Sequence, residues 1–390
     1  MADLKQFLLS FGAWASGLSG GDRHLLEMAA RWREHVDIRV AAPRRGEETI
    51  RSFLGDVGFT PVSGGEPSGP TEGLGLAALY LKRAIVAETR PAQTDVVVAA
   101  SHFLPDAATL HAATRHGAHG VAYVYHLVAG RTDRSPRTLW SKTDERLSLA
   151  LLRRSAGTVF SSNAETAAVL RDRGFDPVHT DVGVDVTSFR RARPGSAPPI
   201  AVFVARLVPK KGLRDAIAAW PRVLERVPAA KLVIAGSGPE REAAEALARA
   251  GGLAGSIVWL GFISEEEKRD LLANARVLVA PSYEEGWGIS VAEALASALP
   301  VVAYRLPTLD ELFGGAYEPT APGDLEALAE ALVRYLTDDD LAERASAIAL
   351  ACVARFDLAA IATAELDTIL ERSARPGTSG QGLRHPTRLS

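Results

Sequence analysis

The sequence has little of several features that would point to particular classes of protein. Cysteine occurs once in 390 residues, so an intrachain disulfide and a disulfide-stapled secreted fold are excluded. The formal net charge is −3, so no general basic field favours a nucleic-acid partner. No apolar run reaches the length of a membrane span. The amino-terminal stretch lacks a basic region followed by a long apolar segment, and no signal peptide is therefore expected.

The remaining composition is that of an ordinary globular protein. It is 47% hydrophobic and 23% charged, and the length suits two domains. The single Cys352 lies in an apolar helical pattern, which fits a reducing compartment. We therefore expect a cytoplasmic protein with no nucleic-acid partner. Peripheral contact with a membrane stays open, as does the choice between a monomer and a homodimer.

The stretch from Val277 to Ala303 holds the most informative pattern. An apolar run at 277–280 predicts a strand, and an Ala- and Leu-rich run at about 289–298 predicts a helix. Pro300 ends that helix and precedes a second apolar run at 301–303. This order predicts a parallel βαβ unit whose loop lies at the carboxyl edge of the sheet, where ligands bind.

Two acidic residues stand out in this unit: Glu285 in the loop and Glu293 inside the helix. A carboxylate accepts hydrogen bonds from paired hydroxyls such as those of a ribose or a hexose. Gly286 and Gly288 allow backbone N–H groups to approach a ligand at a helix N-terminus. The alternative is a solvated loop and a surface acid, which the Pro-Ser, the paired glycines and the closing Pro-Val-Val-Ala disfavour.

These residues carry a resemblance to a known family. The segment PSYEEGWGISVAEALASALPVVA resembles the donor-site signature of the retaining family-four glycosyltransferases, which is Glu-Gly-Phe-Gly, a second Glu, and Pro-Val-Val-Ala. The resemblance runs from about Leu8 to Ile369, strongly in the second half and loosely in the first. Trp287 replaces the usual Phe, and Ala298 replaces a usual Gly, which would tighten the turn before Pro300. The resemblance implies the GT-B fold, two Rossmann-like doubly wound α/β domains facing a cleft.

A second α/β domain is also indicated by the order of the chain. Residues 190–199 read as a linker, because they are basic, contain Pro and Gly, and have no periodicity. A strand pattern restarts at 200–207. The predicted divisions are an acceptor-side domain at 1–193 with a helix at about 357–373 that, by the resemblance, crosses back to it, a nucleotide-sugar domain at 198–356, and a disordered tail at 374–390.

Two cations follow the restarted strand. Arg206 and Lys211 flank a turn ahead of Gly212, and Arg offers a planar fork while Lys offers a movable point charge, which suits a diphosphate. The alternative is a solvated basic turn. The resemblance places an Arg and a Lys of the family on the donor diphosphate, and the spacing to Gly212 favours Lys211 over Lys210.

In the first half, a predicted strand at 121–127 ends in His126. The family often has a His there that touches the donor sugar and phosphate, so we prefer His126 to His102. The alternative is a histidine that caps the sheet. Gly20 and Gly21 precede a helix and match family glycines near the donor phosphates or the acceptor; ordinary turn chemistry is equally compatible. Residues 43–75 show no clear long element and suggest an acceptor-side loop.

The base of the nucleotide has its own candidates. Gly236 lies in a Gly-Ser-Gly-Pro turn that lacks the third glycine of a dinucleotide fingerprint, and we interpret it as a turn near the nucleotide. The family holds the base against the loop that contains Phe262 and Ile263, for which core packing is an equal alternative.

The resemblance implies a retaining transfer from a nucleotide-diphospho-sugar. Glu293 would hold the ribose, Glu285 and the N–H groups of Gly286, Trp287 and Gly288 would hold the sugar, and Arg206 and Lys211 would stabilise the departing diphosphate. The acceptor would attack on the leaving-group face, with a donor phosphate oxygen taking its proton. No Asp-x-Asp pair lies near the donor loop, so no metal and no cofactor is expected. UDP-sugars are favoured and GDP-sugars remain open, as do a small-molecule, lipid or glycan acceptor.

Three other readings stay open. An NAD-dependent Rossmann oxidoreductase would need a complete glycine fingerprint and an acid after the second strand, neither of which is clean. A non-catalytic nucleotide-sugar-binding protein would keep the donor site without turnover. A phosphorylase-like enzyme would need a Schiff-base lysine.

Overall fold

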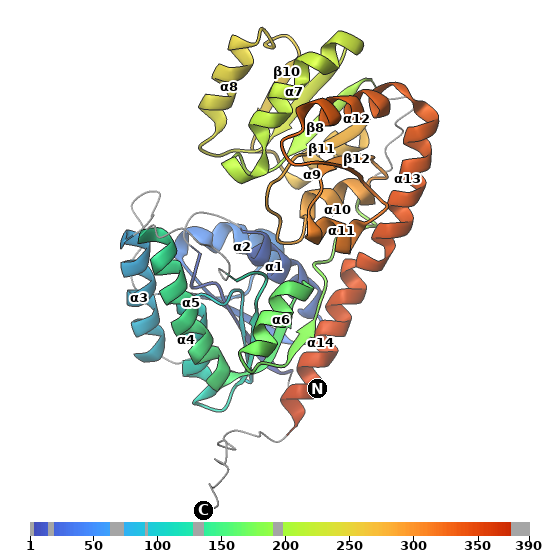
Figure 1. The fold of residues 1–390 in the computed structure, drawn as a ribbon. Coiled ribbons are helices and arrows are strands. Elements are labelled where there is room, and N and C mark those ends of the chain that lie inside the picture. Colours follow the sequence, from blue (N-terminus) through green and yellow to red (C-terminus); the bar gives the residue numbers. More distant parts are fainter. Residues whose placement is uncertain are drawn as a thin grey trace, which may run out of the picture. The chain divides into compact units, whose positions relative to one another are not determined.

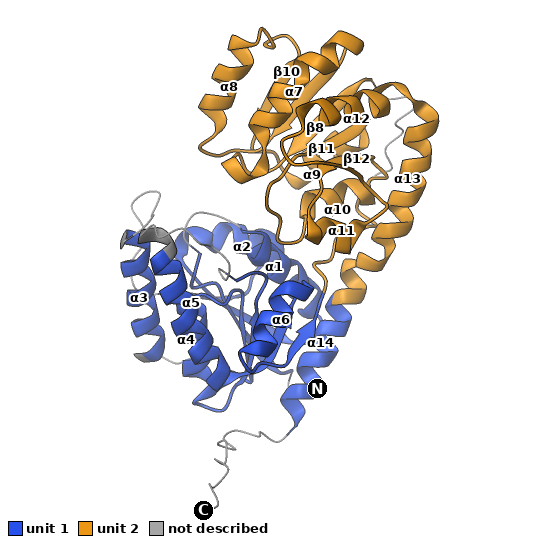
Figure 2. Cartoon of the chain, viewed as in Figure 1, with its two compact units in different colours: residues 1–180, 362–390 blue, residues 181–361 orange. Residues whose placement is uncertain are grey.

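The chain divides into two compact units, each with its own parallel sheet. The computed structural model describes residues 4–14, 19–62, 74–89, 93–127, 136–189 and 198–375. The first unit comprises residues 1–180 and 362–390, and the second comprises residues 181–361 (Figure 2). Most of the predicted linker and nearly all of the predicted tail lie outside the described residues.

The sheet of the first unit has seven parallel strands in the order β3-β2-β1-β4-β5-β6-β7. Its strands are β1 (Gln6–Ser10), β2 (Asp37–Ala42), β3 (Gly58–Pro61), β4 (Val96–Ala99), β5 (His119–Tyr123), β6 (Ala156–Ser161) and β7 (Pro177–His179). Its helices are α1 (Gly20–Trp32), α2 (Glu47–Leu54), α3 (Leu74–Thr89), α4 (Leu104–Thr114), α5 (Pro136–Ser155) and α6 (Ala164–Asp172) (Figure 1). Strand and helix alternate, which is the doubly wound arrangement expected from the sequence.

Two expectations for this unit need correction. The strand predicted over 121–127 is β5, which ends at Tyr123, because its pairing with β4 stops at Ala122 and its pairing with β6 stops at Tyr123. His126 therefore lies in the loop after the strand. The region 43–75 contains α2 and β3, which are short elements that give weak periodicity, and residues 63–73 lie outside the described part.

The sheet of the second unit has six parallel strands in the order β10-β9-β8-β11-β12-β13. Its strands are β8 (Ile200–Val204), β9 (Lys231–Ala235), β10 (Ile257–Gly261), β11 (Val277–Ala280), β12 (Val301–Tyr304) and β13 (Glu318–Thr320). Its helices are α7 (Leu213–Arg226), α8 (Arg241–Ala250), α9 (Glu265–Ala273), α10 (Ile289–Ala296), α11 (Pro307–Phe313), α12 (Leu325–Thr337) and α13 (Asp339–Val353).

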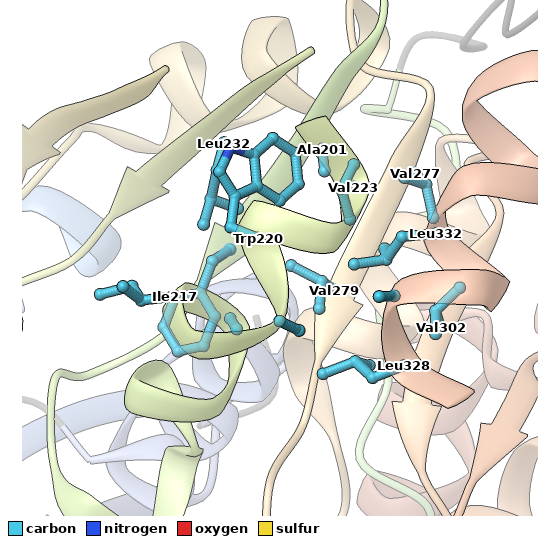
Figure 3. Close-up of a cluster of buried hydrophobic side chains, with 14 of the residues drawn as sticks. Ala201, Ile217, Trp220, Val223, Leu232, Val277, Val279, Val302, Leu328 and Leu332 are labelled. Atoms are coloured by element: carbon cyan, nitrogen blue, oxygen red, sulfur yellow. The ribbon is translucent and has the colours of Figure 1, made fainter. Parts of the chain in front are cut away.

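The core of the second unit explains why its strands read as unbroken apolar runs. Alternate residues of β11, Val277 and Val279, belong to the same cluster of buried side chains as Trp220 of α7 and Leu332 of α12 (Figure 3). The intervening Leu278 is also buried, on the opposite face. Parallel strands covered on both faces lose the polar alternation of half-exposed strands.

The last described helix, α14 (Leu358–Ala374), is attached to the first unit from Ala362 onward. Trp32 Nε1 donates to the carbonyl oxygen of Ala362 at 2.9 Å. The buried carboxylate of Glu365 accepts hydrogen bonds from the hydroxyls of Tyr123 and Thr180. A buried carboxylate with two such donors is costly to misplace, so this contact holds the helix in register. No helix of the described residues has the length and apolar character needed to cross a membrane.

Candidate active site

The loops after β8 and β11 meet at the carboxyl edge of the second sheet. The two strands are hydrogen-bonded neighbours, with Val277 paired to Ala201 and Leu278 to Val202. Their following loops therefore leave the sheet side by side. This neighbourhood brings together Lys211 and Glu285, which are 74 residues apart in the chain.

Lys211 and Glu285 form the central contact of this edge. Lys211 Nζ lies 2.6 Å from Oε1 and 2.7 Å from Oε2 of Glu285, and Ser282 Oγ donates to Oε1 at 2.8 Å. The side chains of the pair are only 16% and 9% exposed, whereas the neighbouring pair, Lys210 with Glu284, is 40% and 53% exposed. The Lys211–Glu285 pair is therefore the one shielded from solvent, where charges interact more strongly.

A second set of contacts holds the two loops together. The hydroxyls of Tyr283 and Tyr304 donate to Asp215 Oδ2 at 2.5 and 2.7 Å, and Tyr283 N donates to the carbonyl oxygen of Lys210 at 2.8 Å. Burial and the bond to Asp215 raise the pKa of Tyr304, so its hydroxyl stays a donor. The sequence did not indicate Asp215 or Tyr283, since a tyrosine and an acid give no signal without their partner.

The turn between them requires glycine at position 212. Gly212 has φ +68°, and a Cβ there would lie 1.9 Å from the carbonyl oxygen of Pro281. The backbones of the two loops therefore touch at this point, which only a residue without a side chain allows.

Arg206 lies just beyond β8 and is exposed. Within the part of the chain that the structure describes, its guanidinium makes no hydrogen bond or ion pair. The edge therefore presents one cation held by Glu285 and one whose donors are available to an anion.

Glu293 lies in α10 with its carboxylate only 3% exposed. Lys268 of α9 places its Nζ 2.7 Å from Glu293 Oε1 and 2.8 Å from Glu265 Oε2. Sequence reasoning missed Lys268. The signal that could have revealed it is its spacing of four residues from the buried Leu272, which puts both side chains on the inner face of α9.

The glycine-bearing loop has two different sides. Gly286 is exposed, while the ring of Trp287 is 5% exposed and packs edge-on against Phe313 and Phe356. Gly288 caps α10 with φ +98°. In the described residues, no group accepts a hydrogen bond from the N–H groups of 286–288. The backbone of this loop, and not the indole ring, is thus what a ligand would meet.

The predicted base-site residues lie beyond β10. Phe262 is 85% exposed, so core packing does not account for it, and Ile263 is half-buried. Gly236 has φ +142°, and its N–H donates to the carbonyl oxygen of Gly261 at 2.7 Å. A Cβ at Gly236 would lie 1.8 Å from the carbonyl oxygen of Ala205, so this glycine serves the packing of the two loops.

The first-unit candidates gather around Tyr125. Gly20 and Gly21 open α1, and a Cβ at Gly21 would lie 2.6 Å from the Tyr125 ring. His126 is exposed, with its ring 6.0 Å from that of the buried His102. Burial, and to a smaller extent the neighbouring His126, lowers the pKa of His102 to about 3, so His102 stays neutral. The exposed His126 is the histidine that a ligand could reach.

Residues 187–350 match the family described as glycosyl transferases group 1. This segment contains both loops of the site described above. The family match covers less than half of the chain, and it is this segment that is similar to glycosyl transferases group 1. Among the described residues, no group of three or more His, Cys, Asp or Glu side chains could hold a metal ion.

Curated relatives of this glycosyltransferase family match part of the chain. The phosphatidyl-myo-inositol mannosyltransferase of Mycobacterium tuberculosis is 32% identical over 220 residues, which are 53% of this chain and 57% of that one. The glycogen synthase of the same organism is 33% identical over 205 residues, 50% of this chain and 49% of that one. The chain thus spans about half the length of these relatives.

Solved structures share the fold over nearly the whole chain. Sucrose-phosphate synthase from Thermosynechococcus elongatus has a TM-score of 0.76 and 19% identity, covering 94% of this chain and 98% of that one. HepE from Anabaena, in complex with UDP and glucose, has a TM-score of 0.73 and 18% identity, covering 94% and 99%. These likenesses show the GT-B fold, with its two parallel Rossmann-like sheets.

Proposed function

We propose that the protein is a retaining glycosyltransferase that moves a sugar from a nucleotide-diphospho-sugar to an acceptor hydroxyl. The observation that carries the proposal is the meeting of Lys211 and Glu285 at the carboxyl edge of the second sheet, where the loop after β8 also contains the exposed Arg206. This edge lies within the segment that matches the family. The Anabaena structure, which contains UDP and glucose, supports a UDP-sugar as the donor.

The charges of this edge fit the transfer. As the bond between sugar and phosphate breaks, negative charge collects on the diphosphate, and Arg206 and Lys211 would stabilise it. Lys211 would contact the diphosphate while it keeps Glu285 within hydrogen-bond range. One ammonium would then connect the diphosphate to the carboxylate that holds the sugar hydroxyls. The acceptor oxygen would form the new bond on the same face, and its proton would pass to a phosphate oxygen.

The donor-side glycines and acids complete the proposed site. The N–H groups of Gly286, Trp287 and Gly288 would bind sugar hydroxyls at the N-terminus of α10, and Glu293 would bind the ribose. Phe262, with its exposed ring, and Ile263 would contact the base. His126, Gly20 and Gly21 of the first unit would contact the sugar, the phosphate or the acceptor.

The test uses the donor alone, since transfer to water needs no acceptor. A panel of UDP- and GDP-sugars, with NADH included, is screened by thermal shift, and release of the nucleoside diphosphate is then measured. We expect Arg206→Ala to lower turnover by about 10²- to 10³-fold, because it removes one preorganised donor to the developing charge.

The matched control is Arg214→Ala. Arg214 lies in the first turn of α7, and its exposed guanidinium binds Glu240. The turnover of this variant should stay near that of the wild type. Wild-type turnover in Arg206→Ala would refute the assignment of the diphosphate site. Binding of NADH in place of every nucleotide-sugar would favour the oxidoreductase.

A further inference from the structure

A buried lysine outside the predicted site contacts the carboxylate assigned to the ribose. Lys268 is 6% exposed, although it lies in a helix whose first turn contains Glu265, Glu266 and Glu267. Its Nζ bonds Glu293 Oε1 at 2.7 Å and Glu265 Oε2 at 2.8 Å. Glu293 is almost fully buried, whereas the side chain of Glu265 is 45% exposed. The contact with Glu293 is therefore the one that explains why the ammonium is buried.

Stability alone does not account for this pair. Burying two charges costs solvation free energy that their attraction only partly returns, and apolar residues at such positions are often at least as stabilising. The inner face of α9 also contains Leu272, so a larger apolar residue at 268 would extend an apolar surface. A lysine at this place therefore points to a requirement of the carboxylate that it holds.

Resting on the proposed function, we propose that Lys268 is a positioning residue that orients Glu293 toward the ribose hydroxyls and so makes the site selective for ribonucleotide donors. A carboxylate has about four lone-pair sites, and one ammonium occupies only one of them. The ammonium holds Oε1 and balances the negative charge where water is excluded. The carboxylate is then fixed in the orientation in which it would accept hydrogen bonds from the ribose hydroxyls.

The selectivity follows from the hydrogen bonds. A hydroxyl that donates to a held carboxylate forms a charge-assisted bond, which is stronger than a bond between neutral groups. A 2′-deoxyribose lacks one of these donors and leaves part of the buried carboxylate without a partner. If Glu293 rotates freely, both sugars lose the advantage of a preorganised acceptor, and the difference between them shrinks.

The experiment compares UDP and GDP with their 2′-deoxy forms by calorimetry, together with KM and kcat for donor hydrolysis. In the wild type we expect the ribonucleotide to bind about 10- to 100-fold more tightly than its deoxy form. Lys268→Met keeps a long unbranched side chain and removes the charge. In this variant the ratio of ribonucleotide to deoxyribonucleotide affinity should fall below about threefold, and the change should appear in KM and not in kcat. Lys268→Arg should restore part of the ratio.

Two further variants separate the possible outcomes. Lys231→Met removes an exposed lysine at the start of β9 and should keep the wild-type ratio. Glu293→Gln should by itself lower the ratio of ribonucleotide to deoxyribonucleotide affinity. Adding Lys268→Met to Glu293→Gln should lower this ratio no further. The inference can therefore still be tested with one of these variants if the other folds poorly. If Lys268→Met keeps the wild-type ratio and loses affinity equally for both sugars, the lysine is only structural. That result overturns the inference and leaves the proposed function standing. Failure of the wild-type protein to bind any of these nucleotides overturns the proposed function and the inference with it.

Discussion

Asp106 makes the stability of the first unit depend on pH in a way that can be tested directly. Its carboxylate lies at the start of α4 and is 1% exposed. Oδ1 accepts from Ser10 Oγ at 2.7 Å and from Gly12 N at 2.6 Å, and Oδ2 accepts from Ser101 Oγ at 2.6 Å. Burial raises the pKa of Asp106 from 3.8 to about 7, and these hydrogen bonds only partly oppose the shift.

The sign and size of the effect follow from linkage. Between pH 4 and pH 7, roughly, the folded state keeps the proton of Asp106 while the unfolded state has released it. The favourable contribution is therefore complete below the unfolded pKa and is lost as the pH rises through the folded pKa. At about 1.36 kcal/mol per pH unit, the two units from pH 5 to pH 7 amount to about 2 to 3 kcal/mol.

Asp106→Asn removes the titration and keeps the shape. The amide oxygen of Asn takes the bonds from Ser10 and Gly12, and its NH₂ group donates to Ser101 Oγ, as a protonated carboxyl would. At pH 5 the variant should therefore melt close to the wild type. At pH 8 it should be more stable by about 2 to 3 kcal/mol, which for a unit of about 200 residues is a rise in Tm of about 5 to 10 °C.

The assay is thermal unfolding at pH 5, 6, 7 and 8, with the Tm difference between variant and wild type as the readout. Asp144, whose pKa burial also raises to about 7, titrates in both proteins and cancels in this difference. Asp37→Asn, at an exposed position of the same unit, is the control and should show no trend. Parallel curves for Asp106→Asn and the wild type across this range would refute the reasoning.

Two further predictions concern backbone conformation in the second unit, each measured by urea unfolding. Gly212→Ala should lower the free energy of unfolding by at least about 2 kcal/mol, because its Cβ would meet the carbonyl oxygen of Pro281. The control, Gly255→Ala, lies at an open position and should change this free energy by no more than about 0.5 kcal/mol. Equal effects of the two substitutions would contradict the argument. Ala298→Gly should raise the free energy of unfolding by about 0.5 to 1 kcal/mol, because Ala298 has φ +56° and the relief of strain exceeds the added entropy of the unfolded chain. The control, Ala296→Gly, lies inside α10 and should lower this free energy. A loss of stability in both variants would show that the turn is not strained.

Much of the architecture was predictable from local signals. The apolar runs, Gly and Pro boundaries and helical spacing indicated two alternating α/β patterns, and both parallel sheets are confirmed. The replacement of a family glycine by Ala298 marked the turn before Pro300, where Ala298 has the positive φ that glycine usually adopts. These features depend on neighbours in the chain, which is why a sequence reveals them.

Other features depend on contacts between distant elements. The burial of Lys268 depends on Glu293 in another helix, so an acidic helix start concealed it. The end of β5 at Tyr123 depends on where its pairing with β4 and β6 stops, which placed His126 beyond the strand. The ring of Trp287 is buried because Phe313 and Phe356 surround it.

The amino-acid sequence by itself determined the order of strands and helices and the residue types available at the carboxyl edge of each sheet. Only the tertiary structure decided that β8 and β11 are neighbours, that Lys211 therefore holds Glu285, and that Lys268 holds Glu293. The physical reason is that hydrogen-bond periodicity and turn chemistry act within a few residues, whereas ion pairs between remote loops form only after the sheet has fixed which loops lie side by side.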